Sequence, residues 1–264
     1  MSPLTEPTRI ILRNGWQPMD PDAAAYITAV ETADGQALEE KVKIAIDNFV
    51  LGCKADGIWA AIKASCILAG ARTLDGALVP LAGTAPTNFN FVAGDYNRKT
   101  GLVGDGSTKY LNSNRNNNAD PQDSKHLSTW VSQVSSSTGT AFIGTSNEVG
   151  RSTLFRGLNG INGNLAASGG DSFFAGTSQL STGFYGLNRS SSSSINYRIS
   201  GITGNTSSFS QSPSAVSIHV FTLNPVSNYS NARLAFYSIG ESLDLALLDA
   251  RVTTLMSDLA TAIP

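Results

Sequence analysis

The sequence has few charged residues and few cysteines. Charged side chains make up 14% of its 264 residues, against about 25% in a typical globular domain. The formal net charge is −2, so the surface offers no basic field for nucleic acid or anionic lipid. The two cysteines, Cys53 and Cys66, lie in apolar stretches. Because there are only two and their neighbours are apolar, we expect both to be buried free thiols.

Long apolar runs are also missing. No stretch approaches the roughly 20 apolar residues that a transmembrane helix needs. The N-terminus lacks the basic and apolar segments of a secretory signal peptide. We therefore expect no membrane insertion, no nucleic-acid partner, and synthesis in a cytoplasm without a secretory signal.

Residue patterns typical of catalytic sites are scarce. His126 and His219 each lack a partner at the spacing of a metal-binding pair. The sequence contains no G-x-S-x-G nucleophile elbow, and the glycine-rich segment 101–107 lacks the lysine of a phosphate loop. We predict a non-enzymatic protein without a cofactor or a metal ion.

Two chemical alternatives stay open. A polysaccharide hydrolase needs two carboxyl groups at a defined separation, and Glu148 and Asp171 are the pair to test. They come from a region, residues 88–240, that has a single glutamate and five aspartates. Calcium needs several clustered oxygen ligands, and Asp120 and Asp123 are the nearest approach to such a cluster.

Helix signals lie in the first third of the chain. Asp20-Pro21-Asp22 combines a capping aspartate, a proline at the first helical position and an acid in the first turn. It predicts a helix that runs to about residue 33. A second helix is expected over about 36–54, and Ile58, Trp59 and Ile62 predict a third, short one.

The C-terminal segment, residues 216–263, changes its apolar period. Its first part alternates apolar and polar residues, as a half-buried strand does, and a second strand follows after Pro225. Ser242 is then predicted to cap an amphipathic helix that folds back on the body. The apolar stripe of this helix is Leu248, Val252, Leu255, Leu259 and Ile263.

Between these helical regions the sequence is typical of β-structure. Short alternating or aromatic runs are separated by Gly, Ser and Asn clusters, which favours an antiparallel β-sandwich or jelly roll. The candidate strands are 88–92, 109–112, 127–134, 141–144, 153–156, 172–175, 183–188, 195–200, 216–222 and 233–239.

The most unusual polar stretch is 112–120, which is rich in asparagine. Amide side chains offer donors and acceptors together, which suits the hydroxyl groups of sugars. Asparagine also tolerates left-handed turn geometry, so a plain exposed turn is the alternative. The candidate ligand-binding residues are Asn112, Asn114, Arg115, Asn116 and Asn117.

Four segments carry a resemblance to a known group of proteins. Segment 54–64 reads K-A-D-G-I-W-A-A-I-K-A and follows a helix that opens with D-P-D-A at residues 20–23 and continues with Tyr26-Ile27. Segments 97–111 and 236–243 follow downstream. Together they resemble tail-fibre and virion structural proteins of tailed bacteriophages, cyanophages and other marine phages among them.

The resemblance implies a concanavalin A-like, laminin-G-like jelly roll in a protein of the virion, at the tail or the capsid surface. It supplies no catalytic residues. The calcium-binding acids of legume-type lectins have no clear match here, which puts metal-assisted sugar binding in doubt.

We therefore predict an extended arm over 1–19, a helical anchoring or oligomerisation subdomain with a connector over 20–86, and a sandwich with a C-terminal clasp helix over 87–264. The leading hypothesis is a tail-fibre adhesin that contacts host-surface carbohydrate. A capsid decoration or cement protein is the near alternative, and a free secreted lectin is a third. Expected partners are other virion proteins, bound through the arm and helices, and copies of the chain itself, with a trimer as the first choice.

Overall fold

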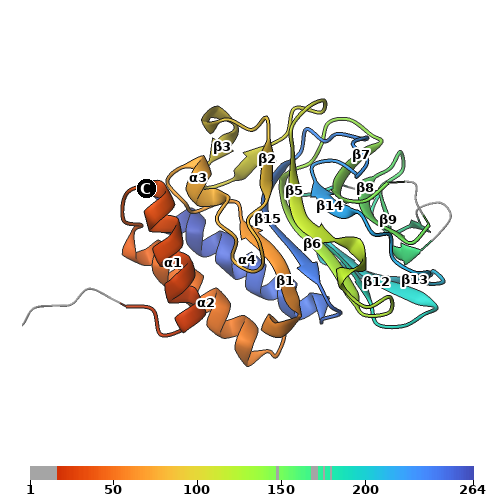
Figure 1. The fold of residues 1–264 in the computed structure, drawn as a ribbon, viewed down its shortest axis with the longest axis horizontal. Helices are drawn as coiled ribbons and strands as arrows, with labels where there is room; N and C mark the ends of the chain where they lie inside the picture. The colour runs from red at the N-terminus through yellow and green to blue at the C-terminus, as the bar shows by residue number, and fades with distance from the viewer. Residues whose placement is uncertain (1–16, 147–148, 168–171, 175, 179) are drawn as a thin grey trace, which may run out of the picture.

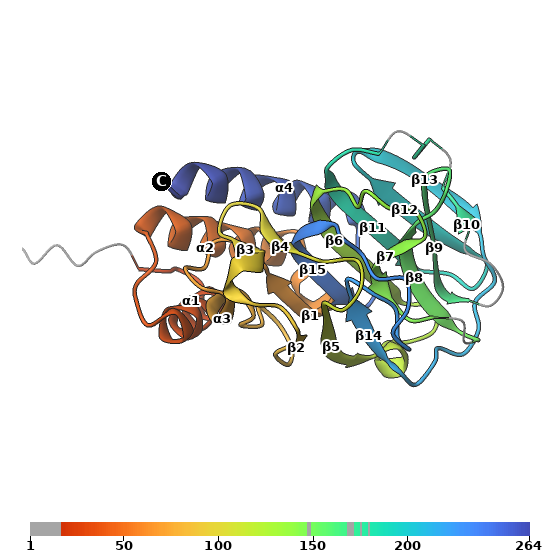
Figure 2. The same ribbon diagram turned by 90° about the horizontal axis from the view of Figure 1, so that it is seen from above.

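The computed structural model describes residues 17–146, 149–167, 172–174, 176–178 and 180–264. Most of the predicted N-terminal arm lies outside this part, as do Glu148 and Asp171. The described chain is mainly β, with antiparallel strands in two packed sheets and helices gathered at one end (Figures 1 and 2). This confirms the predicted antiparallel sandwich with a helical N-terminal part and a C-terminal helix.

Sheet A joins segments from residues 62 to 240. Its spatial order is β13 (Ile202–Ser207), β12 (Ser194–Ile199), β11 (Gly183–Arg189), β6 (Lys125–Gln133), β15 (Arg233–Gly240), β4 (Gly101–Val103) and β3 (Tyr96–Asn97), with β1 (Ile62–Ile67) also paired to β15.

Sheet B lies over one face of sheet A. Its spatial order is β10 (Ser172–Phe173), β9 (Ile161–Ala167), β8 (Arg151–Arg156), β7 (Thr140–Gly144), β14 (Ser217–Val220), β5 (Tyr110–Asn116) and β2 (Thr87–Phe89). All ten predicted strands coincide at least in part with observed ones, whereas β1, β3, β4, β9 and β13 were missed.

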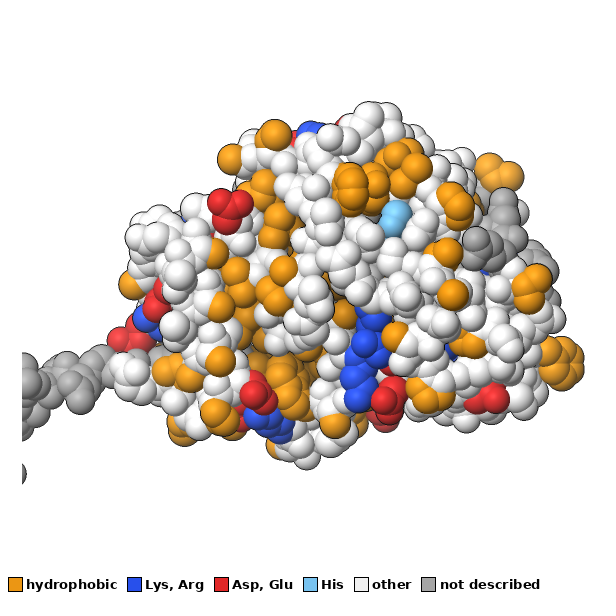
Figure 3. Space-filling model, viewed as in Figure 1, with side chains coloured by type: hydrophobic (Ala, Val, Ile, Leu, Met, Phe, Trp, Pro, Cys, Tyr) orange, Lys and Arg blue, Asp and Glu red, His pale blue; other side chains and the backbone are white. Residues whose placement is uncertain are grey.

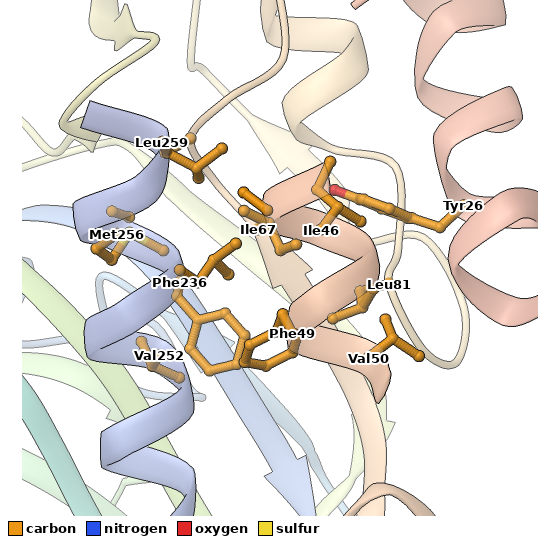
Figure 4. Close-up of a cluster of buried hydrophobic side chains, with 14 of the residues drawn as sticks. Tyr26, Ile46, Phe49, Val50, Ile67, Leu81, Phe236, Val252, Met256 and Leu259 are labelled. Carbon is orange, nitrogen blue, oxygen red and sulfur yellow. The ribbon is translucent and has the colours of Figure 1, made fainter. Parts of the chain in front are cut away.

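Sheet A is covered on both faces. One hydrophobic cluster fills the space between the two sheets. A second joins the other face of sheet A to α1 (Pro21–Asp34), α2 (Glu40–Ala55) and α4 (Leu245–Ala262) (Figure 4). Because it is covered from both sides, β15 is buried at every residue from Leu234 onward, as expected of a central strand with two packed faces.

The first predicted helix is confirmed in its boundaries and its cap. The Asp20 carboxylate accepts hydrogen bonds from the backbone N–H groups of Asp22 and Ala23, and Gly35 ends α1 in the left-handed conformation at φ 67°. α3 (Leu74–Ala77) is a single turn in the connector that follows β1.

The predicted third helix is wrong. Residues Trp59–Ala61 form one 3₁₀ turn, η1. The next six residues form β1, in which Ile62 pairs with Gly240 and Ile67 with Phe236. Ile58, Trp59 and Ile62 have helical spacing, but from Ile62 onward apolar and polar residues alternate as in a strand. The pairing with β15 and burial in the core favour that strand. β1 thus belongs to the sandwich although it lies within the span predicted as a helical subdomain.

The C-terminal helix packs on its own sheet. Its predicted apolar stripe is buried, and α4 runs from the sandwich back along α2 (Figure 2). The predicted cap is two residues too early, because Asp244 rather than Ser242 accepts the N–H groups of Ala246 and Leu247. The Ser242 hydroxyl instead lies 3.1 Å from that of Ser124.

Two further predictions concern single features. Cys53 and Cys66 are both buried free thiols, as expected. No helix in the described part of the chain is long and apolar enough to span a bilayer.

Candidate functional site

The asparagine-rich segment forms the end of β5 and the 3₁₀ turn η3 (Asn117–Ala119). Along β5 the side chains alternate between the core and the surface. Leu111 and Ser113 are buried, whereas Asn112 is half-buried and Asn114 exposed. Asn114 has φ 56°, a left-handed conformation that asparagine adopts more readily than most residues. The alternation along the strand and the left-handed residue Asn114 together place the Asn114 and Asn116 side chains at the surface.

Three of the predicted residues line one pocket. Asn114, Arg115 and Asn116 meet residues of β1 and of the loop 83–84 around a hollow of about 290 Å³. This volume is close to the lower end of the roughly 300–1,000 Å³ that small-molecule sites occupy. The pocket therefore has room for a small polar ligand. It is lined by Lys63, Ala64, Gly83, Thr84, Ser113, Asn114, Arg115, Asn116 and Ala119.

Arg115 is held in place by a buried carboxylate. Its Nε lies 3.0 Å from an oxygen of Asp120, and a second nitrogen, Nη2, bonds the other oxygen. The buried Lys125 ammonium donates to the backbone oxygens of Asn117 and Asp120. Burial lowers the pKa of Lys125 to about 8. The two bonds to the Asp120 carboxylate keep the Arg115 guanidinium in a fixed position beside the pocket.

The amides of the pocket differ in how they are fixed. Asn114 donates from Nδ2 to the backbone oxygen of Ala85 at 2.8 Å and to the hydroxyl of Thr87 at 3.0 Å. Asn116 is exposed. The pocket therefore combines an oriented amide, an exposed amide and a guanidinium. Such a set recognises hydroxyl or carboxyl groups.

Asn117 is not part of this pocket. Its side chain is fully buried and donates to the backbone oxygen of Gly150 at 2.7 Å and to the hydroxyl of Ser214 at 3.1 Å. Its Oδ1 accepts from the Ser152 hydroxyl at 2.7 Å. These bonds tie η3 to the sheet B loops, which is a structural role. Asn112 lies outside the pocket as well, opposite His219 in the strand register.

Sequence reasoning missed the opposite wall of the pocket. Lys63 of β1 and Thr84 lie far from the asparagine segment along the chain, and Lys63 pairs with Glu241 at 3.0 Å. The span containing both residues was predicted as helix and connector. No local pattern marks them as site residues, because only the pairing of β1 with β15 brings Lys63 to this place.

The remaining candidate groups serve the fold. His126 is buried, with Nδ1 2.6 Å from the backbone oxygen of Glu241 and Nε2 2.7 Å from the Ser238 hydroxyl. Burial lowers its pKa to about 4. Asp120, one half of the calcium alternative, is paired with Arg115. Among the described residues, no group of three His, Cys, Asp or Glu side chains is placed to hold a metal ion.

Comparisons with known proteins identify the fold. No protein-family profile and no curated protein matches the chain. Among solved structures, the botulinum neurotoxin serotype D binding domain aligns with a TM-score of 0.50 and 14% identity over 74% of this chain and 51% of that one. The botulinum neurotoxin type G receptor binding domain aligns with a TM-score of 0.41 and 12% identity, over 73% and 51%.

A further similar structure is domain 4 of an extracellular arabinanase from Geobacillus stearothermophilus in complex with arabinotriose. It aligns with a TM-score of 0.36 and 14% identity over 57% of this chain and 80% of that one. The chain spans about half the length of the neurotoxin structures. At these identities the likeness to the serotype D domain establishes a shared β-sandwich fold.

Proposed function

We propose that this chain is a non-enzymatic structural protein of a tailed-phage particle that binds carbohydrate on the host surface. The main support for this proposal is the pocket at the end of β5, which the predicted residues Asn114, Arg115 and Asn116 line together with Lys63. Amide and guanidinium groups held around a small hollow suit the hydroxyl groups of a sugar.

The fold is consistent with a binding function but does not specify the ligand. The serotype D neurotoxin segment with the same sandwich is a binding domain, and one fold hosts many functions. The virion setting comes from the segments 20–27, 54–64, 97–111 and 236–243, which resemble phage structural proteins. A β-sandwich that binds a ligand at the particle surface accounts for both the fold and the resemblance of these segments.

The pairing of several described polar groups supports the non-enzymatic part of the proposal. A general base must reach its substrate, whereas both ring nitrogens of His126 face groups inside the protein. Asp95 pairs with Lys109, and Asp120 pairs with Arg115. The hydrolase alternative would rest on Glu148 and Asp171. It predicts release of reducing ends from host polysaccharide, and that release would be lost in Glu148→Gln and Asp171→Asn.

The helical end is the proposed attachment to the particle. A hollow of about 440 Å³ lies there, lined mainly by apolar residues of α1 and by Trp59, Ile62 and the segment 79–82. The predicted arm leads into the same helix. We propose that this end binds another protein of the particle. We also expect the chain to form a homo-oligomer, with a trimer as the first choice. Sedimentation of the purified chain measures its oligomeric state.

Gold-labelled antibody on purified particles tests the location. Label at the fibres or tail tip is the expected result. Label spread over the head would favour the capsid decoration alternative, and unlabelled particles would contradict the virion assignment.

Binding is tested separately, on a panel of defined oligosaccharides. Asn116→Ala is the informative variant, because this exposed side chain lines the pocket. We expect Asn116→Ala to bind the oligosaccharide at least about tenfold more weakly than the unchanged protein. The control variant Asn205→Ala, on β13 of the other sheet, should bind it as the unchanged protein does.

A further inference from the structure

A row of aromatic side chains crosses three neighbouring strands of sheet B. The rings of Phe89 and Tyr110 are stacked, with centroids 4.3 Å apart and an interplanar angle of 4°. The Tyr110 ring also stacks on the His219 imidazole, with ring centroids 4.9 Å apart. The rings of Tyr110 and Tyr229 meet edge to face, with centroids 6.2 Å apart. These residues, Phe89, Tyr110, His219 and Tyr229, are called the aromatic row below.

Strand register places the row on the outer surface. Phe89 of β2 pairs with Tyr110 of β5, and their neighbour Leu111 points into the core between the sheets. Phe89 is 37% exposed. In the described part of sheet B, β2 is the last strand, so no further strand lies beyond its ring. Figure 3 shows hydrophobic side chains beside a histidine on this face of the molecule.

The aromatic row and the pocket lie on the same strand. Going along β5 from Tyr110, Asn112 comes next on the outer face, flanked by Thr87 and His219 in the register. Asn114 follows, bonded to Thr87, and already lines the pocket. Between Asn112 and Asn116, four steps along β5 match only two along β14, so at about 3.3 Å per residue the strip from Tyr110 to Asn116 spans roughly 13 Å. This strip is longer than a single sugar ring.

We propose that the aromatic row is a second subsite of the carbohydrate site and stacks against the apolar face of a pyranose ring. The ligand is then an oligosaccharide that runs along β5, with one sugar in the pocket and another on Phe89. Asn112 and Thr87 offer hydrogen bonds to the hydroxyl groups between the two ends. This inference rests on the proposed carbohydrate binding and adds the ligand's length and its second contact.

The chemistry of the strip favours a sugar over a protein partner. A pyranose has a C–H face that packs on an aromatic ring and a rim of hydroxyl groups that bond amides. The strip offers the same alternation, with rings at Phe89 and Tyr110 and amides at Asn112 and Asn114. A stable protein interface buries about 800 Å² per partner. A row one ring wide, with His219 only 6% exposed, offers far less.

The test compares a short and a long ligand on the full chain. The oligosaccharide that binds best on the panel is titrated as its disaccharide and its hexasaccharide, by calorimetry. The unchanged protein is expected to bind the hexasaccharide more tightly. In Phe89→Ala this advantage should fall about tenfold, as the loss of an aromatic contact implies, while disaccharide binding stays the same.

Phe209→Ala is the matched control, because Phe209 is 79% exposed and lies beyond the end of β13 in the other sheet. Thermal unfolding of both variants checks that they are folded. Equal hexasaccharide affinity in Phe89→Ala and Phe209→Ala would contradict the aromatic subsite, whereas the proposed sugar binding in the pocket would stand. A change of oligomeric state in Phe89→Ala would instead make the row a contact between copies. If no oligosaccharide binds the unchanged protein, both proposals fail.

Discussion

Phe49 of α2 and Phe236 of β15 meet edge to face, with ring centroids 5.9 Å apart and an interplanar angle of 67° (Figure 4). Phe49 is 3% exposed and Phe236 is fully buried. The contact joins the helical layer to the central strand of sheet A. The helices are thus a third layer of the sandwich, with a hydrophobic core in common with it.

This shared core predicts a large effect of a helix substitution on the whole molecule. Phe49→Ala should lower the free energy of unfolding by about 3–5 kcal/mol, as for other buried aromatic residues cut back to alanine. Urea unfolding followed by circular dichroism measures it. The exposed Phe209→Ala should change stability by less than about 0.5 kcal/mol, and similar losses in the two variants would contradict the shared core.

The sequence predicted best those features that depend on neighbours along the chain. Asp20 and Pro21 start α1 because capping requires only the next two or three residues. The burial of Leu248 and Val252 followed from helical spacing alone. Ser242 shows the limit of such signals, since Asp244 lies two residues on and has the stronger acceptor.

The features that depend on remote pairing could not be predicted. The helical spacing of Ile58, Trp59 and Ile62 conceals the start of β1, whose place is set by pairing with β15 about 170 residues away. The same holds for the candidate site. Asn114 and Asn116 stand out by composition, whereas Lys63 and Phe89 join them only through the strand register. No alternation within one segment encodes which strands become neighbours.

A second prediction concerns the buried Asp34 carboxylate at the end of α1. It accepts the backbone N–H groups of Arg72 at 2.7 Å and Thr73 at 2.8 Å, and the Thr73 hydroxyl at 2.7 Å. Asp34→Ala should destabilise the protein by about 2–4 kcal/mol, because each buried donor left unpaired costs about 1–3 kcal/mol. Chemical denaturation measures it. Asp75→Ala, at an exposed position of α3, is the control and should be nearly neutral.

A third prediction concerns Arg189, which is fully buried. Its Nε donates to the backbone oxygen of Leu165 at 2.7 Å, and its Nη1 donates to those of Ser191 at 3.0 Å and Ser208 at 2.8 Å. A lysine has no planar fork for several acceptors at once. Arg189→Lys should therefore lower stability by about 2–3 kcal/mol, since buried acceptors lose their partners.

The serine-rich loop 190–194 should also be cut faster by proteases in Arg189→Lys, because Arg189 fixes its start. Arg251→Lys is the matched control. Its side chain is 38% exposed and pairs with Asp56. Lysine keeps the charge of this exposed pair, so Arg251→Lys should change stability by less than about 1 kcal/mol. Equal protection of the loop in both variants would show that Arg189 does not hold it.

A fourth prediction is that the protein loses stability in mild acid because of its histidines. Burial lowers the pKa of His126 to about 4, and burial likewise lowers that of His219 to about 4, whereas a histidine in an unfolded chain titrates near 6.5. Below pH 6.5 the unfolded chain therefore binds protons that the folded chain does not, and the free energy of unfolding falls as the pH decreases. The histidine contribution to this fall should end near pH 4, where the folded histidines titrate too.

The effect is on the order of 3 kcal/mol for each histidine at most, from about 1.4 kcal/mol per pKa unit. Urea unfolding at pH 8, 6.5, 5.5 and 4.5 measures the slope, and His126→Gln should remove about half of it. Glutamine keeps a donor and an acceptor for Glu241 and Ser238 but binds no proton. A stability that stays flat from pH 8 to 4.5 in the unchanged protein would mean that both imidazoles can be protonated in the folded state, against their burial.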